Sequence, residues 1–151
     1  MYQLVYSSFV QKHVSKESIA KLLLRSQANN LKNEVTGCIV FHGNEFIHLL
    51  EGRKEDVQKL YTRIVKDTRH RHVTILYKQT ISDRFFDASF ISSDMLNLNQ
   101  YSDNAMQLAP AELAMMRHKM ADSTVAVKLF SHITHQLYQE KGKVCPAPAE
   151  T

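Results

Sequence analysis

Two apolar runs, CIVF at 38–41 and FIHLL at 46–50, are separated by a few turn residues around Gly43. Apolar runs on either side of a short turn are typical of a β-hairpin. Side chains along a strand point alternately to its two faces, and both faces of both runs are apolar here. Other elements must therefore cover both faces of the hairpin, which predicts a layered fold.

The segments around the hairpin alternate between strand and helix patterns. YQLVYSSF at 2–9 predicts a first strand, and Ser15 is the expected N-cap of a helix that runs to about Asn30. A second helix is predicted after the hairpin, followed by strands at 72–81 and 86–92. The apolar stripe of this second helix consists of Val57, Leu60, Tyr61, Ile64 and Val65. The order β-α-β-β-α-β-β predicts an α+β, ferredoxin-like sheet with two helices on one face.

Residues 93–141 are predicted to form a C-terminal helical extension of the same domain, on the other face of the sheet formed by 1–92. Pro110 suits the first turn of one helix. A second helical stripe consists of Leu129, Phe130, Ile133 and Leu137, of which Leu129 and Ile133 are expected to be buried against the sheet. The last segment, 142–151, has two prolines in CPAPAET and is predicted to be a disordered tail.

Composition limits the classes of protein to which the chain can belong. It has 151 residues, of which 44% are hydrophobic and 23% charged, as expected of one globular domain. No apolar run reaches about 18 residues and no secretory signal precedes the first strand, so we expect a cytoplasmic protein without a membrane partner. The formal charge of +4 is spread along the chain apart from RHRH at 69–72, so no nucleic-acid partner is predicted.

No motif for catalysis or metal binding stands out. The chain has neither a glycine-rich phosphate loop nor a nucleophile elbow, so no enzyme activity and no catalytic residue are predicted. Two histidine pairs have spacings that suit a metal, His132 with His135 and His70 with His72. Neither pair has a carboxylate or cysteine to complete it, and histidines on a solvated surface explain them equally well.

A histidine in the middle of an apolar strand is the most unusual position in the chain. His48 shares a strand face with Phe46 and Leu50, so its ring needs a polar partner there. Tyr6 on the first strand could lie on the same sheet face. Further polar residues end the two helices, namely Asn29, Asn30, Asp67, Arg69 and His70. Each has a structural explanation when taken alone, such as a helix stop or cations that suit the helix dipole.

Taken together, these segments resemble the BLUF family of blue-light sensors. The resemblance rests on LVYSS around Tyr6, on Asn30 followed by EVTG at the spacing Asn-x4-[Ile/Val]-Thr-Gly, on EFIHLLEG and on VKDTRHRHV. It covers residues 1 to about 92. The resemblance implies a bound flavin, FAD with FMN as the alternative, whose isoalloxazine ring lies between the two helices and over the sheet.

The resemblance also implies a role for each polar residue. Tyr6 matches the tyrosine that gives an electron to the excited flavin, and His48 takes the position of a glutamine that links this tyrosine to the ring. Asn30 matches an asparagine that hydrogen-bonds the polar edge of the ring, and Asn29 a neighbouring contact. The remaining matches, at the polar edge and the ribityl side, are Asp67, Arg69 and His70.

Two departures from the family pattern bear on the light response. Glutamine has distinct oxygen and nitrogen ends that can exchange places, whereas the imidazole of His48 is rigid and can take a proton near neutrality, its reference pKa being about 6.5. In FDASF, Ala88 and Phe90 occupy positions where relatives have tryptophan or alanine and methionine. The predicted light response therefore depends on whether histidine can replace the amide.

The predicted function is a flavin-binding blue-light sensor that signals through protein contacts, with self-association into a homo-oligomer and an unidentified downstream protein as partners. The alternative is a light-insensitive interaction domain that keeps the fold but has lost flavin binding or the light response.

Overall fold

A computed structural model describes residues 1–103 and 105–140 of the chain. Its centre is a five-stranded sheet with the strand order β4-β1-β3-β2-β5. The strands are β1 (Tyr2–Val10), β2 (Thr36–His42), β3 (Glu45–Gly52), β4 (His70–Thr80) and β5 (Ser89–Ser93). The helices are α1 (Lys16–Lys32), α2 (Lys54–Lys66), the 3-10 turn η1 (Leu98–Gln100), α3 (Pro110–Met115), α4 (Arg117–Ala121) and α5 (Val125–Glu140). The predicted ferredoxin-like α+β order is confirmed.

The β2–β3 hairpin lies inside the sheet, between β1 and β5, and helices cover both of its apolar faces. Its strands pair antiparallel from Thr36 opposite Glu51 to His42 opposite Glu45. At Gly37 the backbone φ is 145°, and a Cβ there would lie 1.8 Å from the carbonyl oxygen of Leu49. Only glycine allows β2 and β3 to approach each other this closely.

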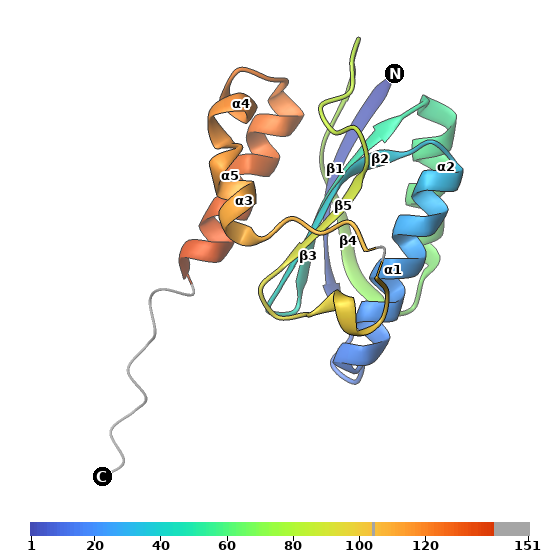
Figure 1. Cartoon of the computed structure of the whole chain (residues 1–151). Helices are drawn as coiled ribbons and strands as arrows, with labels where there is room; N and C mark the ends of the chain where they lie inside the picture. The colour runs from blue at the N-terminus through green and yellow to red at the C-terminus, as the bar shows by residue number, and fades with distance from the viewer. Residues whose placement is uncertain (104, 141–151) are drawn as a thin grey trace.

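Helices α1 and α2 pack side by side on one face of the sheet (Figure 1). The side chain of Ser15 caps α1 by accepting a hydrogen bond from the backbone N–H of Ser18, as the N-cap prediction requires. The helix extends to Lys32, two residues past the predicted end at Asn30. Asn33 ends it by donating its backbone N–H to carbonyls of the last turn, a contact that residue type alone does not specify.

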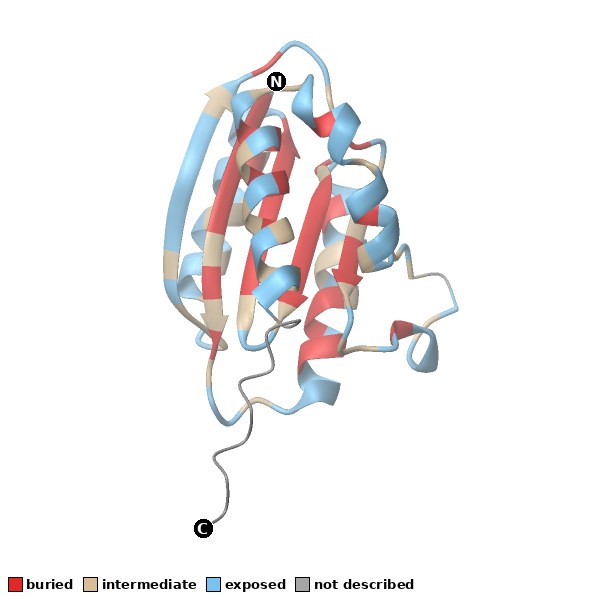
Figure 2. Cartoon of the chain, turned by 90° about the vertical axis from the view of Figure 1, so that its left-hand side faces the viewer, coloured by how far each residue is buried: buried red, intermediate tan, exposed pale blue. Residues whose placement is uncertain are grey.

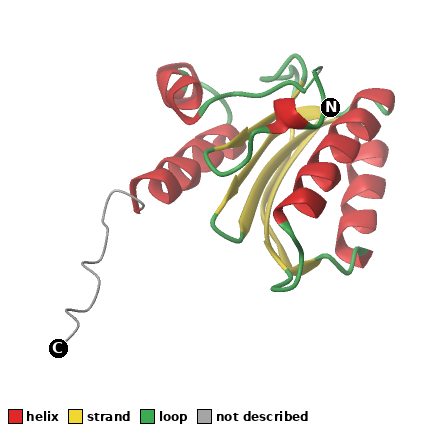
Figure 3. Ribbon diagram, turned by 60° about the horizontal axis from the view of Figure 1, so that its bottom comes forward, coloured by secondary structure: helices red, strands yellow, loops and turns green. Residues whose placement is uncertain are grey.

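Helices α3, α4 and α5 cover the opposite face, so the sheet lies between two helical layers (Figure 3). Pro110 occupies the first turn of α3, as predicted, and α4 is an additional short helix. The face of α5 that enters the core carries Val127, Phe130 and Thr134, which are buried. The expectation that Leu129 would be buried is wrong, because α5 is turned so that Leu129 keeps part of its surface exposed and Phe130 fills the core.

Burial across the sheet falls from its inner strands to one edge. Figure 2 shows buried inner strands and a largely exposed β4, which pairs only with β1. At the other edge β5 runs parallel to β2. Both late strands differ from prediction at their ends: β4 begins at His70 instead of residue 72, and β5 begins at Ser89 instead of residue 86.

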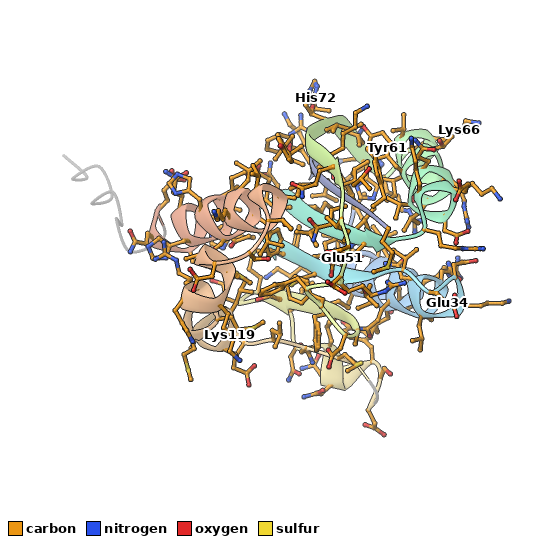
Figure 4. The ribbon with its side chains drawn as sticks, turned by 90° about the horizontal axis from the view of Figure 1, so that it is seen from above. Glu34, Glu51, Tyr61, Lys66, His72 and Lys119 are labelled. Carbon is orange, nitrogen blue, oxygen red and sulfur yellow. The ribbon has the colours of Figure 1, made fainter. Side chains whose placement is uncertain are left out.

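A buried carboxylate connects the sheet to the helical layer of α5. Glu51, at the end of β3, is 0% exposed and accepts hydrogen bonds from the side-chain amide of Gln3 at 2.7 Å and the backbone N–H groups of Phe85 and Phe86 at 2.9 and 2.7 Å. Gln3 in turn accepts a bond from the hydroxyl of Thr124, just before α5, at 2.7 Å. Figure 4 shows Glu51 between the helical layers, so this network joins β1, β3 and the segment before β5.

Two predictions concern other parts of the chain. The proposed tail at 142–151 lies outside the described residues. Within 1–103 and 105–140, none of the helices combines the length and apolar character that a membrane crossing requires.

Candidate functional site

A cleft opens between α1 and α2 over the central strands of the sheet. Its volume is about 680 Å³ when counted up to its open mouth. All seven polar residues singled out in the sequence line it, namely Tyr6, Asn29, Asn30, His48, Asp67, Arg69 and His70. Its apolar walls consist of Leu22, Leu23, Ile39, Phe46, Leu60 and Ile64. The fold therefore brings residues from six different elements to one concave site.

Tyr6 and His48 lie at the floor of this cleft. They face each other in the antiparallel register of β1 and β3, and the Tyr6 hydroxyl lies 2.9 Å from Nδ1 of His48. Residues directly opposite in antiparallel strands point to the same sheet face, so the strand register alone brings the two side chains together. The polar partner that His48 needed is thus the phenol of Tyr6.

Burial keeps both members of this pair neutral. Loss of solvent lowers the pKa of His48 to about 3, with a smaller contribution from His70, and the same loss raises the pKa of Tyr6. The expectation that His48 takes a proton near neutrality is therefore wrong for the folded chain. We assign Tyr6 as the donor to Nδ1, because no other acceptor for its hydroxyl is found in the described part of the chain. Nε2 of His48 then carries the ring proton.

Asn30 presents an unused acceptor. Asn30 is 2% exposed, and its side-chain oxygen Oδ1 has no hydrogen-bond partner. Its side-chain nitrogen Nδ2 makes only a long contact of 3.5 Å to the hydroxyl of Ser89. Buried polar atoms in proteins are almost always paired. An orphaned oxygen that lines a cleft therefore indicates that a group with a donor belongs there. Asn29, one position earlier, also lines the cleft from the last turn of α1.

The polar residues after α2 take part in two polar pairs, one local and one with β1. Asp67, the C-cap of α2, accepts hydrogen bonds from Nε and Nη2 of Arg69, the shorter at 2.6 Å. The hydrogen bond from Arg69 is the main cause that lowers the pKa of Asp67, so this carboxyl is ionised at neutral pH. His70 begins β4, and its Nδ1 lies 2.9 Å from the hydroxyl of Ser8. Burial lowers the pKa of His70 as well.

Three polar residues of the cleft were missed in the sequence. Arg25 and Ser26 line it from α1, and Arg63 lines it from α2. The signal that could have found them is helical spacing, since Arg25 and Ser26 lie one turn before the two asparagines and Arg63 one turn before Asp67.

The sequence and the fold both match known proteins. The family described as BLUF, sensors of blue-light using FAD, matches residues 1–91, which is more than half of the chain. The chain belongs to the BLUF family.

The BLUF relatives include proteins much longer than this chain. The blue light- and temperature-regulated antirepressor BluF of Escherichia coli K12 is 28% identical over 100 residues, which is 66% of this chain and 25% of that protein. The photoactivated adenylate cyclase subunit beta of Euglena gracilis is 26% identical over 87 residues, 58% of this chain and 10% of that protein. The chain thus spans a quarter or less of the length of these curated relatives.

Solved BLUF structures share the fold over nearly the whole chain. BlrB, a BLUF protein in its dark state, has a TM-score of 0.60 at 21% identity and covers 90% of this chain and 96% of its own. The BLUF domain of BlrP1 has a TM-score of 0.62 at 24% identity, with coverage of 97% and 96%. The likeness extends past residue 92, so the helices after the sheet are part of the shared fold.

The cleft of this BLUF chain fits a flavin by the chemistry of its groups. A flavin has an apolar body with a polar rim of carbonyls and ring nitrogens, and it needs apolar walls with a few oriented polar groups. The cleft supplies aliphatic walls, the orphaned Oδ1 of Asn30 as an acceptor for a ring N–H, and the side chains of Arg63 and His48 as donors. The residues present therefore fit the cofactor that the BLUF family uses.

Ala88 and Phe90, near the start of β5, do not line the cleft. The side chain of Phe90 packs in the core on the α5 side of the sheet, and its ring centroid lies 6.0 Å from that of Phe86. The backbone carbonyl of Ala88 accepts a hydrogen bond from the N–H of Gly37. Phe90 thus contributes to the contact between β5 and the helical layer of α5, away from Tyr6 and His48.

A metal site is a separate question from the flavin cleft. Among the residues that the structure describes, no three histidine, cysteine or acidic side chains come close enough to hold a metal ion.

Proposed function

We propose that this chain is a blue-light sensor module that holds a flavin in the α1–α2 cleft and signals through protein contacts, without catalytic turnover. The observation that carries the proposal is the convergence of the buried Tyr6–His48 pair and the orphaned Oδ1 of Asn30 on that one cleft. The BLUF family description supports FAD as the flavin, with FMN as the alternative.

The residues that would hold the flavin divide into two groups. Asn29, Asn30 and Arg63 would bind its polar rim, and the ion pair of Asp67 with Arg69 would lie beside the rim and the ribityl chain. When bound, the flavin supplies absorption of blue light and an excited state that accepts an electron from a nearby donor. The chain supplies the rest: apolar walls that exclude water and a phenol held neutral at the floor.

The buried pair determines what the protein itself can do after light is absorbed. The Tyr6 phenol is oxidisable and is hydrogen-bonded to a neutral imidazole, so Nδ1 of His48 is in place to take the phenol proton if Tyr6 loses an electron. His48 presents its Nε2–H toward the cleft as a donor of fixed direction. Unlike a glutamine amide, the ring cannot exchange a donor for an acceptor by rotating in place.

Flavin binding is tested directly on the purified chain. We expect a yellow protein whose absorption spectrum shows structured flavin bands, and release of the bound molecule by denaturation followed by mass spectrometry distinguishes FAD from FMN. If the chain purifies without flavin and does not bind either form when it is added, the interaction domain without flavin is the correct function. If flavin binds but illumination changes neither its fluorescence nor its absorption, the chain is a light-insensitive flavoprotein.

The partners and the location of the chain stay predictions. Self-association is compatible with the exposed side chains of Ile75, Leu76 and Tyr77 on the edge strand β4, and light scattering after gel filtration measures it. An unidentified downstream protein is the expected recipient of the signal. A cytoplasmic location is tested by cell fractionation.

A further inference from the structure

A shallow groove between α4 and α5 is lined almost entirely by basic side chains. Its volume is about 840 Å³, counted up to its open mouth. Arg117 and His118 line it from α4, and Lys128 and His132 line it from α5. All four side chains belong to exposed residues, and no carboxylate is among the groups that line the groove within the described residues. The groove is therefore positively charged without an internal counter-ion.

Ser131 places an unpaired hydroxyl in the same groove. The residue is 8% exposed, lines the groove from α5 beside His132, and its hydroxyl makes no hydrogen bond within residues 1–103 and 105–140. Serine hydroxyls that are nearly buried are usually paired, often with a backbone carbonyl of the preceding turn. This hydroxyl is a donor available to an oxygen ligand in the groove that the cations Arg117 and Lys128 also line.

We propose that this groove is the docking site for an acidic segment of a partner protein. Carboxylates accept hydrogen bonds from Arg117, Lys128 and the hydroxyl of Ser131, and such charge complementarity steers association and fixes orientation. The groove holds two fixed cations, Arg117 and Lys128, whereas binding of a nucleic acid generally depends on neutralising many backbone phosphates. An acidic peptide segment therefore fits the groove better than a nucleic acid does.

The groove is separated from the flavin cleft by the sheet. Helices α4 and α5 lie on one side of the strands, and α1 and α2 on the other (Figure 1). α5 contacts β3, the strand that carries His48, as well as β1. The proposal goes beyond the sensor function by assigning a surface and a partner chemistry, and it can be tested without flavin or light.

The test measures binding of a fluorescein-labelled oligoglutamate peptide to the full chain by fluorescence anisotropy. We expect saturable binding that weakens as salt is added, because exposed charges are screened. Replacing Lys128→Glu or Arg117→Glu should each weaken binding at least about tenfold, because each variant removes a cation and adds a like charge to the groove. Lys128→Arg should retain binding.

Lys119→Glu is the matched control, because this substitution changes the charge by the same amount as Lys128→Glu. Lys119 is an exposed residue of α4 (Figure 4), and it does not line the groove. Its affinity should stay within about twofold of the unmodified chain. Equal losses in Lys119→Glu and Lys128→Glu would overturn the proposal in favour of non-specific attraction. Tighter binding of a DNA duplex of matched charge, or displacement by inorganic phosphate at the same concentration as the peptide, would also overturn it. Unchanged flavin content in Lys128→Glu separates this result from the sensor function.

Discussion

Tyr6 and His48 face each other across the β1–β3 pair, with the phenol oxygen 2.9 Å from Nδ1 of the imidazole and both side chains within the core. This contact places a histidine where the BLUF pattern has glutamine, and it ties the ring to the one buried phenol at the floor of the cleft. The consequences for light response, cofactor binding and stability can each be measured.

The first prediction concerns the light response. The unmodified protein should show quenched flavin fluorescence but little or no lasting red shift after blue light, because His48 has no amide to rearrange. His48→Gln should gain a persistent, reversible red shift, since it returns a side chain with distinct oxygen and nitrogen ends to the same strand position. Absorption difference spectra before and after illumination measure the shift.

Tyr6→Phe in the glutamine background is the control. It removes the oxidisable phenol and should abolish the gained shift while leaving the dark absorption in place. A strong and reversible red shift in the unmodified protein would contradict the prediction and show that imidazole can replace the amide.

The second prediction concerns the orphaned oxygen of Asn30. Asn30→Ala should weaken flavin binding by about 1 to 3 kcal/mol, because it removes a buried acceptor from the rim of the ring. Titration of the flavin-free protein, followed by fluorescence quenching, gives the affinity. Asn33→Ala is the comparison, because Asn33 lies just beyond α1 and does not line the cleft. Equal affinity in Asn30→Ala and the unmodified chain would place Asn30 outside the flavin site.

The third prediction is a pH dependence of folding caused by His48. Its pKa is about 3 in the folded flavin-free chain. The reference value for an unfolded histidine is about 6.5. The unfolded state therefore binds more protons between these values, so stability is fully present above the reference value and falls as the pH is lowered through this window. From pH 7 to pH 5 the loss from His48 should be about 2 kcal/mol, measured by urea unfolding.

His48→Gln should remove this part of the pH dependence. His70, whose pKa is also lowered by burial, adds a slope of the same sign. Glu45, whose pKa is raised by burial, adds a slope of the opposite sign just above the usual pKa of a carboxyl group. Asp67 has a lowered pKa too, so its contribution is lost only as the pH falls through the acidic range of carboxyl groups, below the measured range of pH 5 to 7. An identical slope in His48→Gln and the unmodified chain would mean that His48 is not buried as a neutral ring.

The fourth prediction concerns the buried carboxylate of Glu51. Glu51→Ala leaves the amide of Gln3 and two backbone N–H groups without their acceptor, and it should destabilise the chain by at least about 2 kcal/mol. Glu55→Ala, on the exposed first turn of α2, should change stability by less than about 0.5 kcal/mol. Urea unfolding of both variants at neutral pH makes the comparison, and similar values for the two would refute a structural role for Glu51.

The fifth prediction distinguishes the two faces of α5. Phe130 is 0% exposed and packs in the core next to Phe86, so Phe130→Ala should cost about 3 to 5 kcal/mol. Leu129→Ala removes a side chain that is only partly buried and should cost clearly less. Thermal or urea unfolding gives both values, and a larger loss at Leu129 would show that α5 is turned the other way.

The sequence by itself determined the helices and strands and which side chains share one face of a strand or helix. Alternation along β1 and β3 put Tyr6 and His48 on cleft-facing sides, because side chains in a strand repeat every second residue. The two helical stripes, the N-cap Ser15 and the hairpin turn were likewise local signals, and each depends on residues close in the chain. The family motifs added the expectation of a flavin and identified seven of the polar residues that line the cleft.

Only the tertiary structure decided what depends on residues distant in sequence. Which residues of the α5 stripe enter the core was decided by packing against the sheet, since Leu129 and Phe130 are adjacent apolar residues of the same predicted stripe and only Phe130 is part of the buried core. The low pKa of His48 results from burial by both layers, and the unpaired Oδ1 of Asn30 results from what surrounds the end of α1. Solvent exclusion is a sum over many neighbours brought together by folding, so no local pattern of residues contains it.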